Sequence, residues 1–548
     1  MAKKKKVIIG IAGVLVVVVV VVAALVIIKP GKKAEPKKEE QQMKNEQQQE
    51  EPKVYDFSAD YSHIATGEVN TGVSVHDPSV FKAGDTYYIY GSHMVGAYTK
   101  DLRTWTGYGN GYTKNNAIYG NLFAEGAHVF DYAGNGDSFI PTDDGGTHVW
   151  APDVIYNKTT GLWYLYYCTT STWNASNLCY GVSDNPEGPY EWKGALIYSG
   201  FNSSQLDRTN VLDYVSKEHA EKNYCLGGWN HSDWPNAIDP CVFYDKDDRM
   251  WMVYGSWSGG IFILEIDVNT GEPIHPEADP VNNVDAYYGK KLMGGRHKSI
   301  EGPYILYDSV SGYYYLFVSY GSLTADGGYQ IRVFRSDKPD GDYVDMNGTN
   351  YMGSGSHATY GLKMSGNYML PSLKKAYKAT GHNSAFVDDD GKMYVVYHTR
   401  FANSGEFHTP RVKQFFVNEE GWPCMLPYAT NGETISETGY EKKDVAGAYY
   451  VVNQGITINK TVAEPFKLIL ETDGKVYGEG IEGTWGMTED TYYMKLTYNN
   501  VEYSGVFCKM PDEAGTEVMT FSAVGNNETI WGVMYPGTST TVQASLVE

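Results

Sequence analysis

Short runs of β-branched and aromatic residues alternate with turns rich in Gly, Asp or Lys over residues 65–430. Two such runs joined by a turn predict a β-hairpin, and an example is the run Tyr87-Tyr88-Ile89-Tyr90 after its turn. One pentapeptide pattern opens five of these hairpins. Its copies are Asp77-Pro78-Ser79-Val80-Phe81, Ala151-Pro152-Asp153-Val154-Ile155, Asp239-Pro240-Cys241-Val242-Phe243, Glu301-Gly302-Pro303-Tyr304-Ile305 and His382-Asn383-Ser384-Ala385-Phe386.

A strand repeat with a period of roughly 60 to 90 residues predicts a β-propeller, with one sheet per repeat around a central channel. Equivalent positions of a propeller point the same way. The first position of the pattern therefore places the carboxylates of Asp77, Asp239 and Glu301 around one axis, together with His382. An isolated Asp-Pro pair is most often a turn, but three acids at one repeated position favour a shared chemical role.

The N-terminal end of the chain differs in composition from the strand-rich region. Residues 7–28 form an apolar run long enough to span a bilayer, and lysines at positions 3–6 precede it. The positive-inside rule places the N-terminus in the cytoplasm and the rest outside, so we expect one N-terminal transmembrane helix that acts as an uncleaved anchor. A cleaved signal segment, which would give a secreted protein, is the alternative. Residues 29–64 are assigned to a charged linker, whose first part, to about residue 53, is a solvated tether of Lys, Glu and Gln.

Residues 436–548 read as short alternating strands broken by the turn pairs Asp473-Gly474 and Asn499-Asn500. This pattern predicts a small antiparallel β-barrel or sandwich. The chain is therefore expected to be all-β, with a membrane segment at 1–28, a linker at 29–64, a propeller at 65–435 and a C-terminal β-domain at 436–548.

Composition narrows the class of partner. The 548 residues carry a net charge of -22, which argues against nucleic acid and other polyanions and suits a neutral ligand. The six cysteines lack metal-type spacing. Cys168 and Cys179 are the nearest candidates for a disulfide, and buried free thiols are the other interpretation.

Two carboxyl groups that flank a bond, one protonated and one ionised, are the usual apparatus for cleaving a glycosidic link. The acid needs a raised pKa, and a neighbouring carboxylate can raise it. Three carboxylates at the channel mouth would supply an acid, a base and a group that tunes the pKa of the acid.

The motifs that carry these residues resemble glycoside hydrolase family 43, and within it the endo-1,5-α-L-arabinanases. The resemblance covers about residues 65–430, and the region from about residue 436 is more weakly similar to the C-terminal β-domain of the longer arabinanases. The motifs are His76-Asp77-Pro78, Trp150-Ala151-Pro152-Asp153, Asn236-Ala237-Ile238-Asp239-Pro240, Ser299-Ile300-Glu301-Gly302-Pro303-Tyr304 and Gly381-His382-Asn383-Ser384.

The resemblance implies a five-bladed propeller and an inverting hydrolase. By motif position Asp77 is the general base that activates water, and Glu301 is the general acid. Asp239 tunes the pKa of the acid and orients the sugar. His382 corresponds to the histidine that holds a calcium ion, largely with waters, on the channel axis.

The resemblance and the register also suggest substrate-binding residues: His76, Trp150, Trp173, Asn236, Ser256 and Trp257. Sugar rings pack their apolar faces on aromatic side chains, although core packing is the alternative for any of these tryptophans. The family often has a Phe-Gly element where this chain has Trp173-Asn174, which leaves the shape of that subsite open.

We therefore expect an extracellular, monomeric enzyme, tethered to the cell surface, that cleaves arabinan and arabino-oligosaccharides with calcium as its cofactor. One alternative is an exo-acting α-L-arabinofuranosidase or β-xylosidase of the same family, since the sequence does not reveal which loops close the site. Another is a glycan-binding surface protein without catalysis, against which the retention of three carboxylates argues.

Overall fold

The structure of the protein is a computed structural model that describes residues 53–111, 116–119, 128–134, 148–171, 175–225 and 232–541. The transmembrane helix predicted at 7–28 and most of the linker lie outside these residues. Among the described residues no helix is both long enough and apolar enough to cross a membrane.

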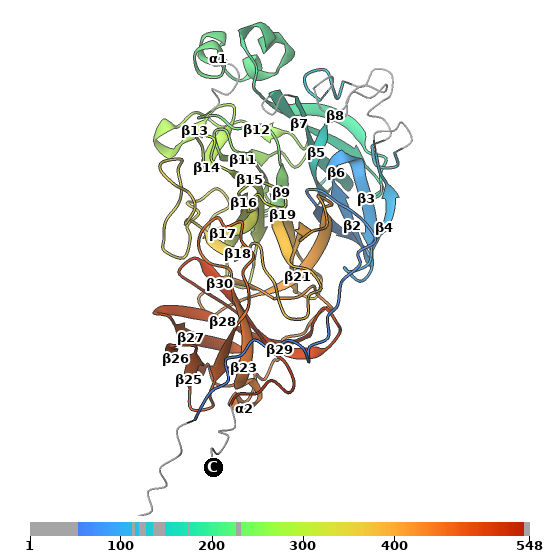
Figure 1. The fold of residues 1–548 in the computed structure, drawn as a ribbon. Helices are drawn as coiled ribbons and strands as arrows, with labels where there is room; N and C mark the ends of the chain where they lie inside the picture. The colour runs from blue at the N-terminus through green and yellow to red at the C-terminus, as the bar shows by residue number, and fades with distance from the viewer. Residues whose placement is uncertain are drawn as a thin grey trace, which may run out of the picture. The chain divides into compact units, whose positions relative to one another are not determined.

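Five antiparallel sheets follow one another along the chain, as predicted, and each forms one blade of a propeller (Figure 1). Blade 1 contains β1 (Ser79–Ala83), β2 (Thr86–Gly91), β3 (Val95–Thr99) and β4 (Thr106–Gly109). Blade 2 contains β5 (Val149–Asn157), β6 (Leu162–Ser171), β7 (Ala175–Ser183) and β8 (Glu191–Ser199). Blade 3 has six strands: β9 (Cys241–Tyr244), β10 (Met250–Tyr254), β11 (Ile261–Ile266), β12 (Pro273–Ile274), β13 (Val284–Asp285) and β14 (Gly289–Met293).

The last two blades repeat the four-stranded order. Blade 4 contains β15 (Ile300–Tyr307), β16 (Tyr314–Tyr320), β17 (Gln330–Ser336) and β18 (Leu362–Ser365). Blade 5 contains β19 (Tyr377–Val387), β20 (Met393–Phe401), β21 (Thr409–Val417) and β22 (Pro423–Met425).

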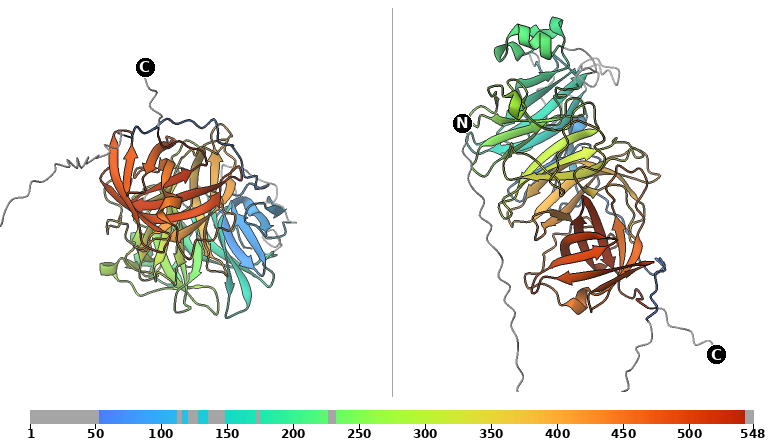
Figure 2. Two further views of the ribbon diagram at one scale, coloured as in Figure 1. Left: turned by 90° about the horizontal axis from the view of Figure 1, so that it is seen from below. Right: turned by 90° about the vertical axis from the view of Figure 1, so that its left-hand side faces the viewer.

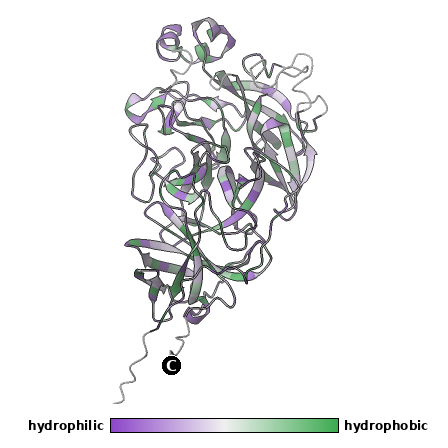
Figure 3. Cartoon of the chain, in the orientation of Figure 1, coloured by the Kyte–Doolittle hydropathy of each residue, from purple (hydrophilic) through white to green (hydrophobic). Residues whose placement is uncertain are grey.

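Helical segments in the described residues are short and lie between or beside the strands. They are η1 (Ser92–Met94), η3 (Ser203–Arg208), η4 (Val211–Asp213), α1 (Lys217–Asn223), η6 (Pro280–Asn282) and α2 (Lys442–Val445). Ser216 caps α1 by accepting the N–H of His219 at 3.2 Å. In Figure 3 α1 is largely hydrophilic, whereas most of the hydrophobic colour follows the strands.

The second strand of a blade is buried on both faces because each blade is packed between two neighbours. In β16 every residue is buried. Tyr315 and Phe317 enter one apolar cluster, whereas Leu316 and Val318 enter the next. A strand alternates its side chains between two faces, so one aromatic run supplies two interblade cores.

Cysteines follow the same alternation. All six are free thiols, and five of them are buried. Cys168 pairs with Leu178 across the sheet, next to the pair Tyr167–Cys179, and the two cysteines enter different interblade clusters. They therefore point to opposite faces of blade 2, which excludes the disulfide and agrees with the free-thiol interpretation.

Side chains near the start of the inner strands link neighbouring blades around the axis. The Asp153 carboxylate accepts the Ser79 hydroxyl at 2.6 Å and the Val242 N–H at 2.7 Å. Cys241 Sγ accepts the Ile305 N–H at 3.4 Å. The ring closes between the last blade and the first, where Ser384 Oγ accepts the Val80 N–H at 3.2 Å.

The C-terminal region is a closed antiparallel barrel rather than a sandwich (Figure 2). Its strands are β23 (Gly447–Asn453), β24 (Phe466–Leu470), β25 (Lys475–Gly478), β26 (Ile481–Met487), β27 (Tyr493–Tyr498), β28 (Val501–Pro511), β29 (Glu517–Gly525) and β30 (Glu528–Met534). Tyr450 and Val533 pair between the first strand and the last, which closes the wall. Phe507, Phe521 and Trp485 fill the interior as an apolar cluster.

One apolar cluster is shared by the barrel and the propeller. Trp531 and Val506 of the barrel belong to it together with Phe317 and Phe415 of blades 4 and 5. The chain before blade 1 also contacts the barrel, since Tyr55 stacks on Tyr477 with ring centroids 4.4 Å apart.

Candidate active site

The repeated pattern forms a bulge at the start of the inner strand in blades 2, 4 and 5. Pairing with the second strand is interrupted there between Trp150 and Asp153, between Glu301 and Tyr304, and between Gly381 and Ser384. The residue at the equivalent position has a positive φ in all five blades, and these residues are Asp77, Ala151, Asp239, Gly302 and His382. Extra residues of this kind turn side chains away from the regular alternation, as bulges beside active sites commonly do.

This geometry corrects the register expected for blade 4. The residue equivalent to Asp77, Asp239 and His382 is Gly302. Glu301 lies one position earlier, and the cross-blade bond from Ile305 N–H to Cys241 agrees with the shifted alignment. Asp77, Asp239 and His382 still line one small cavity with Gly302, and Glu301 joins the group from a different backbone position.

Asp77 is buried and held by three side chains. Its Oδ1 lies 3.0 Å from His382 Nδ1 and 3.1 Å from His76 Nε2, and its Oδ2 accepts the Ser92 hydroxyl. Burial by itself would raise the pKa of Asp77, but the charges of His382 and His76 and the hydrogen bond to His382 hold it well below its usual range. This carboxylate is ionised at neutral pH.

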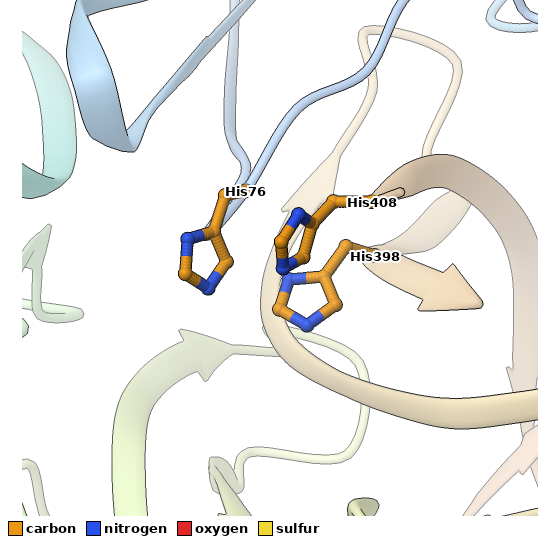
Figure 4. Close-up of side chains that lie close together, drawn as sticks. All are labelled: His76, His398 and His408. Atoms are coloured by element: carbon orange, nitrogen blue, oxygen red, sulfur yellow. The ribbon is translucent and has the colours of Figure 1, made fainter. Parts of the chain in front are cut away.

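Behind Asp77 stands a cluster of three imidazoles, His76, His398 and His408 (Figure 4). One nitrogen of each ring lies within 4.8 Å of one nitrogen of each other ring. His398 Nδ1 accepts the backbone N–H of Asp77 at 3.2 Å, and His408 Nε2 accepts Arg400 Nη2 at 2.6 Å. His76 and His408 stack at 4.0 Å. Only His76 and His408 stack, and His398 meets His408 edge-on, so the cluster packs behind Asp77 and bonds its backbone through His398.

Glu301 receives three hydrogen bonds. Its Oε2 accepts Trp257 Nε1 at 2.6 Å and Ser256 Oγ at 3.1 Å, and its Oε1 accepts the Tyr329 hydroxyl at 2.7 Å. Burial raises the pKa of Glu301 and the charge of Asp77 adds to this, against the lowering effects of Tyr329, His382 and Trp257. The two carboxyl groups therefore have pKa values shifted in opposite directions, as an acid–base pair requires.

Asp239 and His382 complete the group. Burial, with the charges of Glu301 and Asp77, raises the pKa of Asp239 to about 7, although His382 and the Gly302 N–H act in the opposite direction. Burial would lower the pKa of His382, but Asp77, Asp239 and Glu301 raise it to about 9. Three carboxyl groups thus surround one imidazole that carries a proton at neutral pH.

A small cavity of about 20 Å³ lies on the axis below these groups. Asn383 lines it, and among the described residues neither polar atom of its buried amide has a hydrogen-bond partner. The volume suits one water molecule or one ion.

The other residues predicted to bind substrate have varied positions. Ser256 and Trp257 contact Glu301, and Trp257 is 37% exposed, as a sugar-stacking surface requires. Trp150 is partly buried against the cluster of blades 2 and 3. Asn236 is buried and its Oδ1 accepts Ser199 Oγ at 3.5 Å. Trp173 lies outside the described residues.

Several contacts were missed at the level of the sequence. Ser92 could have been found, because Tyr-Gly-Ser recurs at the end of the second strand at Tyr90-Gly91-Ser92, Tyr254-Gly255-Ser256 and Tyr320-Gly321-Ser322. The Ser92 hydroxyl donates to Asp77, and the Ser256 hydroxyl donates to Glu301. Tyr329 and His398 have no such local signal, because Tyr329 reaches Glu301 through the strand pairing of blade 4 and His398 reaches Asp77 where blade 5 meets blade 1.

Comparisons with known proteins agree with the geometry. The family described as "Glycosyl hydrolases family 43" matches residues 214–423, and "C-terminal lipocalin-like domain" matches residues 427–532. The chain is 37% identical to extracellular endo-α-(1→5)-L-arabinanase 2 of Bacillus subtilis over 84% of this chain and 92% of that protein. It is also 37% identical to the extracellular endo-α-(1→5)-L-arabinanase of Thermotoga petrophila, over 84% of this chain and 93% of that one.

Solved structures give the same picture. The endo-1,5-α-L-arabinanase of Thermotoga petrophila superposes on this chain with a TM-score of 0.73 at 36% identity. The superposition covers 86% of this chain and 100% of the Thermotoga chain. A family 43 glycoside hydrolase from Bacillus licheniformis gives a TM-score of 0.72 at 37% identity, over 86% of this chain and 99% of the other.

Proposed function

The chain belongs to glycoside hydrolase family 43, and from this premise we propose that it cleaves internal α-1,5-arabinofuranosidic bonds of arabinan outside the cell. The observation that carries the proposal is the opposite pKa shift of two buried carboxyl groups: the pKa of Asp77 is held well below its usual range, and burial raises the pKa of Glu301. The endo action and the extracellular setting follow from the names of the relatives with 37% identity.

The proposed reaction is a single displacement with inversion. Asp77 accepts a proton from a water molecule while the water oxygen bonds to the anomeric carbon. Glu301 donates its proton to the glycosidic oxygen as the carbon–oxygen bond breaks. Asp77 ends protonated and Glu301 ends ionised, and exchange with solvent restores both. We expect the two carboxyl groups to lie roughly 6.5–9.5 Å apart, which leaves room for the water.

Neighbouring groups have defined parts in this scheme. Ser92 and the His382 imidazole orient the carboxylate of Asp77, and His398 fixes its backbone N–H. Tyr329 and Trp257 hold the carboxyl group of Glu301. Asp239 shares the site with Glu301, and because repulsion between like charges is mutual, it favours the protonated form of the acid.

We also propose a calcium ion near His382. The donor set suits this ion, because the unpaired Asn383 amide oxygen lines the axial cavity with the carboxylates of Asp77 and Asp239, and calcium prefers oxygen ligands. Asn383 and His382, whose imidazole would have to release its proton to the solvent, would hold it with water, and the bound ion would supply positive charge beside the carboxylates. Elemental analysis of the purified protein with an anomalous-scattering map tests this, and a metal-free result in both makes His382 purely structural.

The placement at the cell surface is a proposal from the sequence. The apolar run at 7–28 would anchor the enzyme, and the polar tether of about 25 residues would reach roughly 25–30 Å. Full-length protein in the membrane fraction, with a catalytic region that protease removes from intact cells, supports this placement. A medium protein that begins near Leu25 means that the segment is a cleaved signal.

Incubation with linear, debranched and branched arabinan, followed by sizing of the products, tests the main proposal. Early release of a ladder of oligosaccharides is expected for endo action. Release of single arabinose units or of one short product from the start would instead favour the exo-acting alternative, and proton NMR of the first anomer distinguishes inversion from retention.

A further inference from the structure

A large pocket opens beside the candidate site between blades 3 and 4. Its volume is about 610 Å³, and it is lined by Arg296, Lys298, Gly353, Gly355, Ser356 and His357. Two connections form its walls, one from β14 to β15 and one from β17 to β18. The Gly294 N–H donates to the Tyr351 carbonyl at 2.7 Å and joins them.

Hydrogen bonds tie this pocket to the surroundings of Glu301. Ser299 Oγ and His357 Nε2 are 3.0 Å apart, two residues before Glu301 in the chain. The His297 N–H donates to the Ser258 carbonyl at 3.0 Å. Trp257 donates its backbone N–H to Ile300 at 2.9 Å and its indole N–H to Glu301. Two loop segments that line or flank the pocket are therefore hydrogen-bonded to the segments that carry Trp257 and Glu301.

The pocket is positively charged although the chain carries a net charge of -22. Arg296 is exposed, Lys298 is half-buried, and neither forms an ion pair with a carboxylate in the part of the chain that the structure describes. Burial lowers the pKa of His357 to about 4, and the charges of Lys298 and Arg332 act in the same direction.

Few carboxylates lie near these two cations. The Asp233 carboxylate acts on Lys291, which is a third cation. The Nζ of Lys291 would lie 2.6 Å from a Cβ added to Gly295. Glu301 faces the site of reaction and has its own three hydrogen-bond donors. Among the described residues Arg296 and Lys298 thus offer guanidinium and ammonium donors that form no ion pair with a carboxylate, and Gly355 beside them has open space where a side chain would stand.

We propose that this pocket binds a carboxylate-bearing sugar unit on the leaving-group side of the cleaved bond. The inference rests on the proposed function, because Glu301 protonates the departing oxygen and the sugars beyond it belong to the departing chain. A guanidinium fork matches the two oxygens of a carboxylate, and the lysine adds a point charge. The chemical class is a uronate or aldonate within or at the end of an otherwise neutral arabinan chain.

Arabino-oligosaccharides with modified reducing ends test this assignment. Oxidation of the reducing end gives a terminal carboxylate, and borohydride reduction gives a neutral alcohol on the same chain. The two forms are compared over a series of oligosaccharide lengths. At the length that places the carboxylate in the pocket, we expect the KM of the oxidised form to be about three- to tenfold lower than that of the reduced form. The effect is modest because both charge pairs are partly exposed. The advantage should disappear at roughly 1 M salt, where exposed charges are screened.

The variant Arg296→Gln/Lys298→Gln should lose this advantage and keep the wild-type kcat/KM on the neutral chain. A matched control is Lys443→Gln/Lys475→Gln, which removes two positive charges from exposed positions of the C-terminal region. This control should retain the KM advantage of the oxidised substrate. Equal KM values for both substrates with the wild-type enzyme, or an advantage that survives in the pocket variant, would overturn the assignment. Failure to cleave the neutral chain at all would instead overturn the proposed function.

Discussion

Carboxyl groups of one site acquire pKa values shifted in opposite directions because their partners differ. Asp77 faces two imidazoles and a serine hydroxyl, which favour its charged form. For Glu301, burial outweighs three hydrogen-bond donors and raises the pKa. These opposite shifts suit the roles proposed for the two carboxyl groups, with Asp77 as the base and Glu301 as the acid.

Asp77→Asn and Glu301→Gln should each lower the rate on linear arabinan strongly, toward the upper end of the ~10²–10⁴-fold that proton transfer contributes. Both are isosteric changes at buried carboxyl groups, so the circular dichroism spectrum should stay the same. Initial rates of reducing-end release measure the effect. Asp389→Asn, at an exposed turn of blade 5, serves as the control and should keep full activity. A near-wild-type rate in either site variant would exclude the assigned role.

The pH dependence of kcat/KM follows from the same shifts. Asp77 must be ionised, and its pKa lies well below the usual range, so the acidic limb should lie at low pH. Glu301 must be protonated, and its pKa is raised, so activity should fall on the basic side only above the usual range of a glutamate.

Asp239→Asn removes a negative charge beside Glu301, which lowers the pKa of the acid. The basic limb should therefore move to lower pH, together with a lower maximum rate. A profile recorded from about pH 3 to 10 on one linear substrate tests this. An unchanged basic limb would mean that Asp239 acts only on the sugar.

At the scale of the strand, the backbone turn at the start of each inner strand decides which side chains reach the mouth. A residue with positive φ occupies the equivalent position in all five blades, and only blade 4 places a glycine there. Gly302 has a φ of 56°, and an added Cβ would lie 3.2 Å from the His382 ring. Blade 2 has Ala151 at a φ of 40° in the equivalent place.

Gly302→Ala and Ala151→Gly should change stability in opposite directions. A left-handed conformation costs a non-glycine residue roughly 1–2 kcal/mol, so the first variant should lose about that much and the second should gain up to about 1 kcal/mol. Urea unfolding measures both. Gly302→Ala should also reduce activity, because the new methyl group displaces His382. Equal midpoints for the two variants would contradict this account of the bulge.

At the scale of the molecule, the barrel stabilises the propeller through a shared core and a polar contact at one hairpin. Asn527, in the turn between β29 and β30, donates to Asp345 at 2.7 Å and accepts the Met346 N–H at 3.0 Å. Its carbonyl accepts the Lys363 N–H at 2.9 Å. The barrel interior is filled with aromatic side chains, so its described residues support a structural role.

Asn527→Ala should lower the free energy of unfolding by about 1–3 kcal/mol, because it leaves buried partners in blade 4 unpaired. Asn500→Ala is a matched control. Both asparagines are the second residue of an Asn-Asn hairpin turn, with φ of 64° and 61°, but Asn500 is exposed at the turn between β27 and β28. The difference between the two midpoints measures the contact with the propeller, and a difference near zero would show that the hairpin contributes no interdomain stability.

The sequence by itself determined the blades, the presence of a β-domain after them, and the identity of Asp77, Asp239, Glu301 and His382 as a group. Those features are local: an aromatic strand, a turn and a repeated pentapeptide are each written in consecutive residues. The Tyr-Gly-Ser repeat that carries Ser92 and Ser256 was equally readable.

Only the tertiary structure decided the remaining features. The one-residue offset of Glu301 depends on strand pairing, which a linear pattern does not encode when a bulge adds a residue. Closure of the barrel required the pairing of Tyr450 with Val533, far apart in the chain. Tyr329 reaches Glu301 through the strand pairing of blade 4, and His398 of blade 5 reaches Asp77 where the last blade meets the first, so both contacts join residues far apart in the chain.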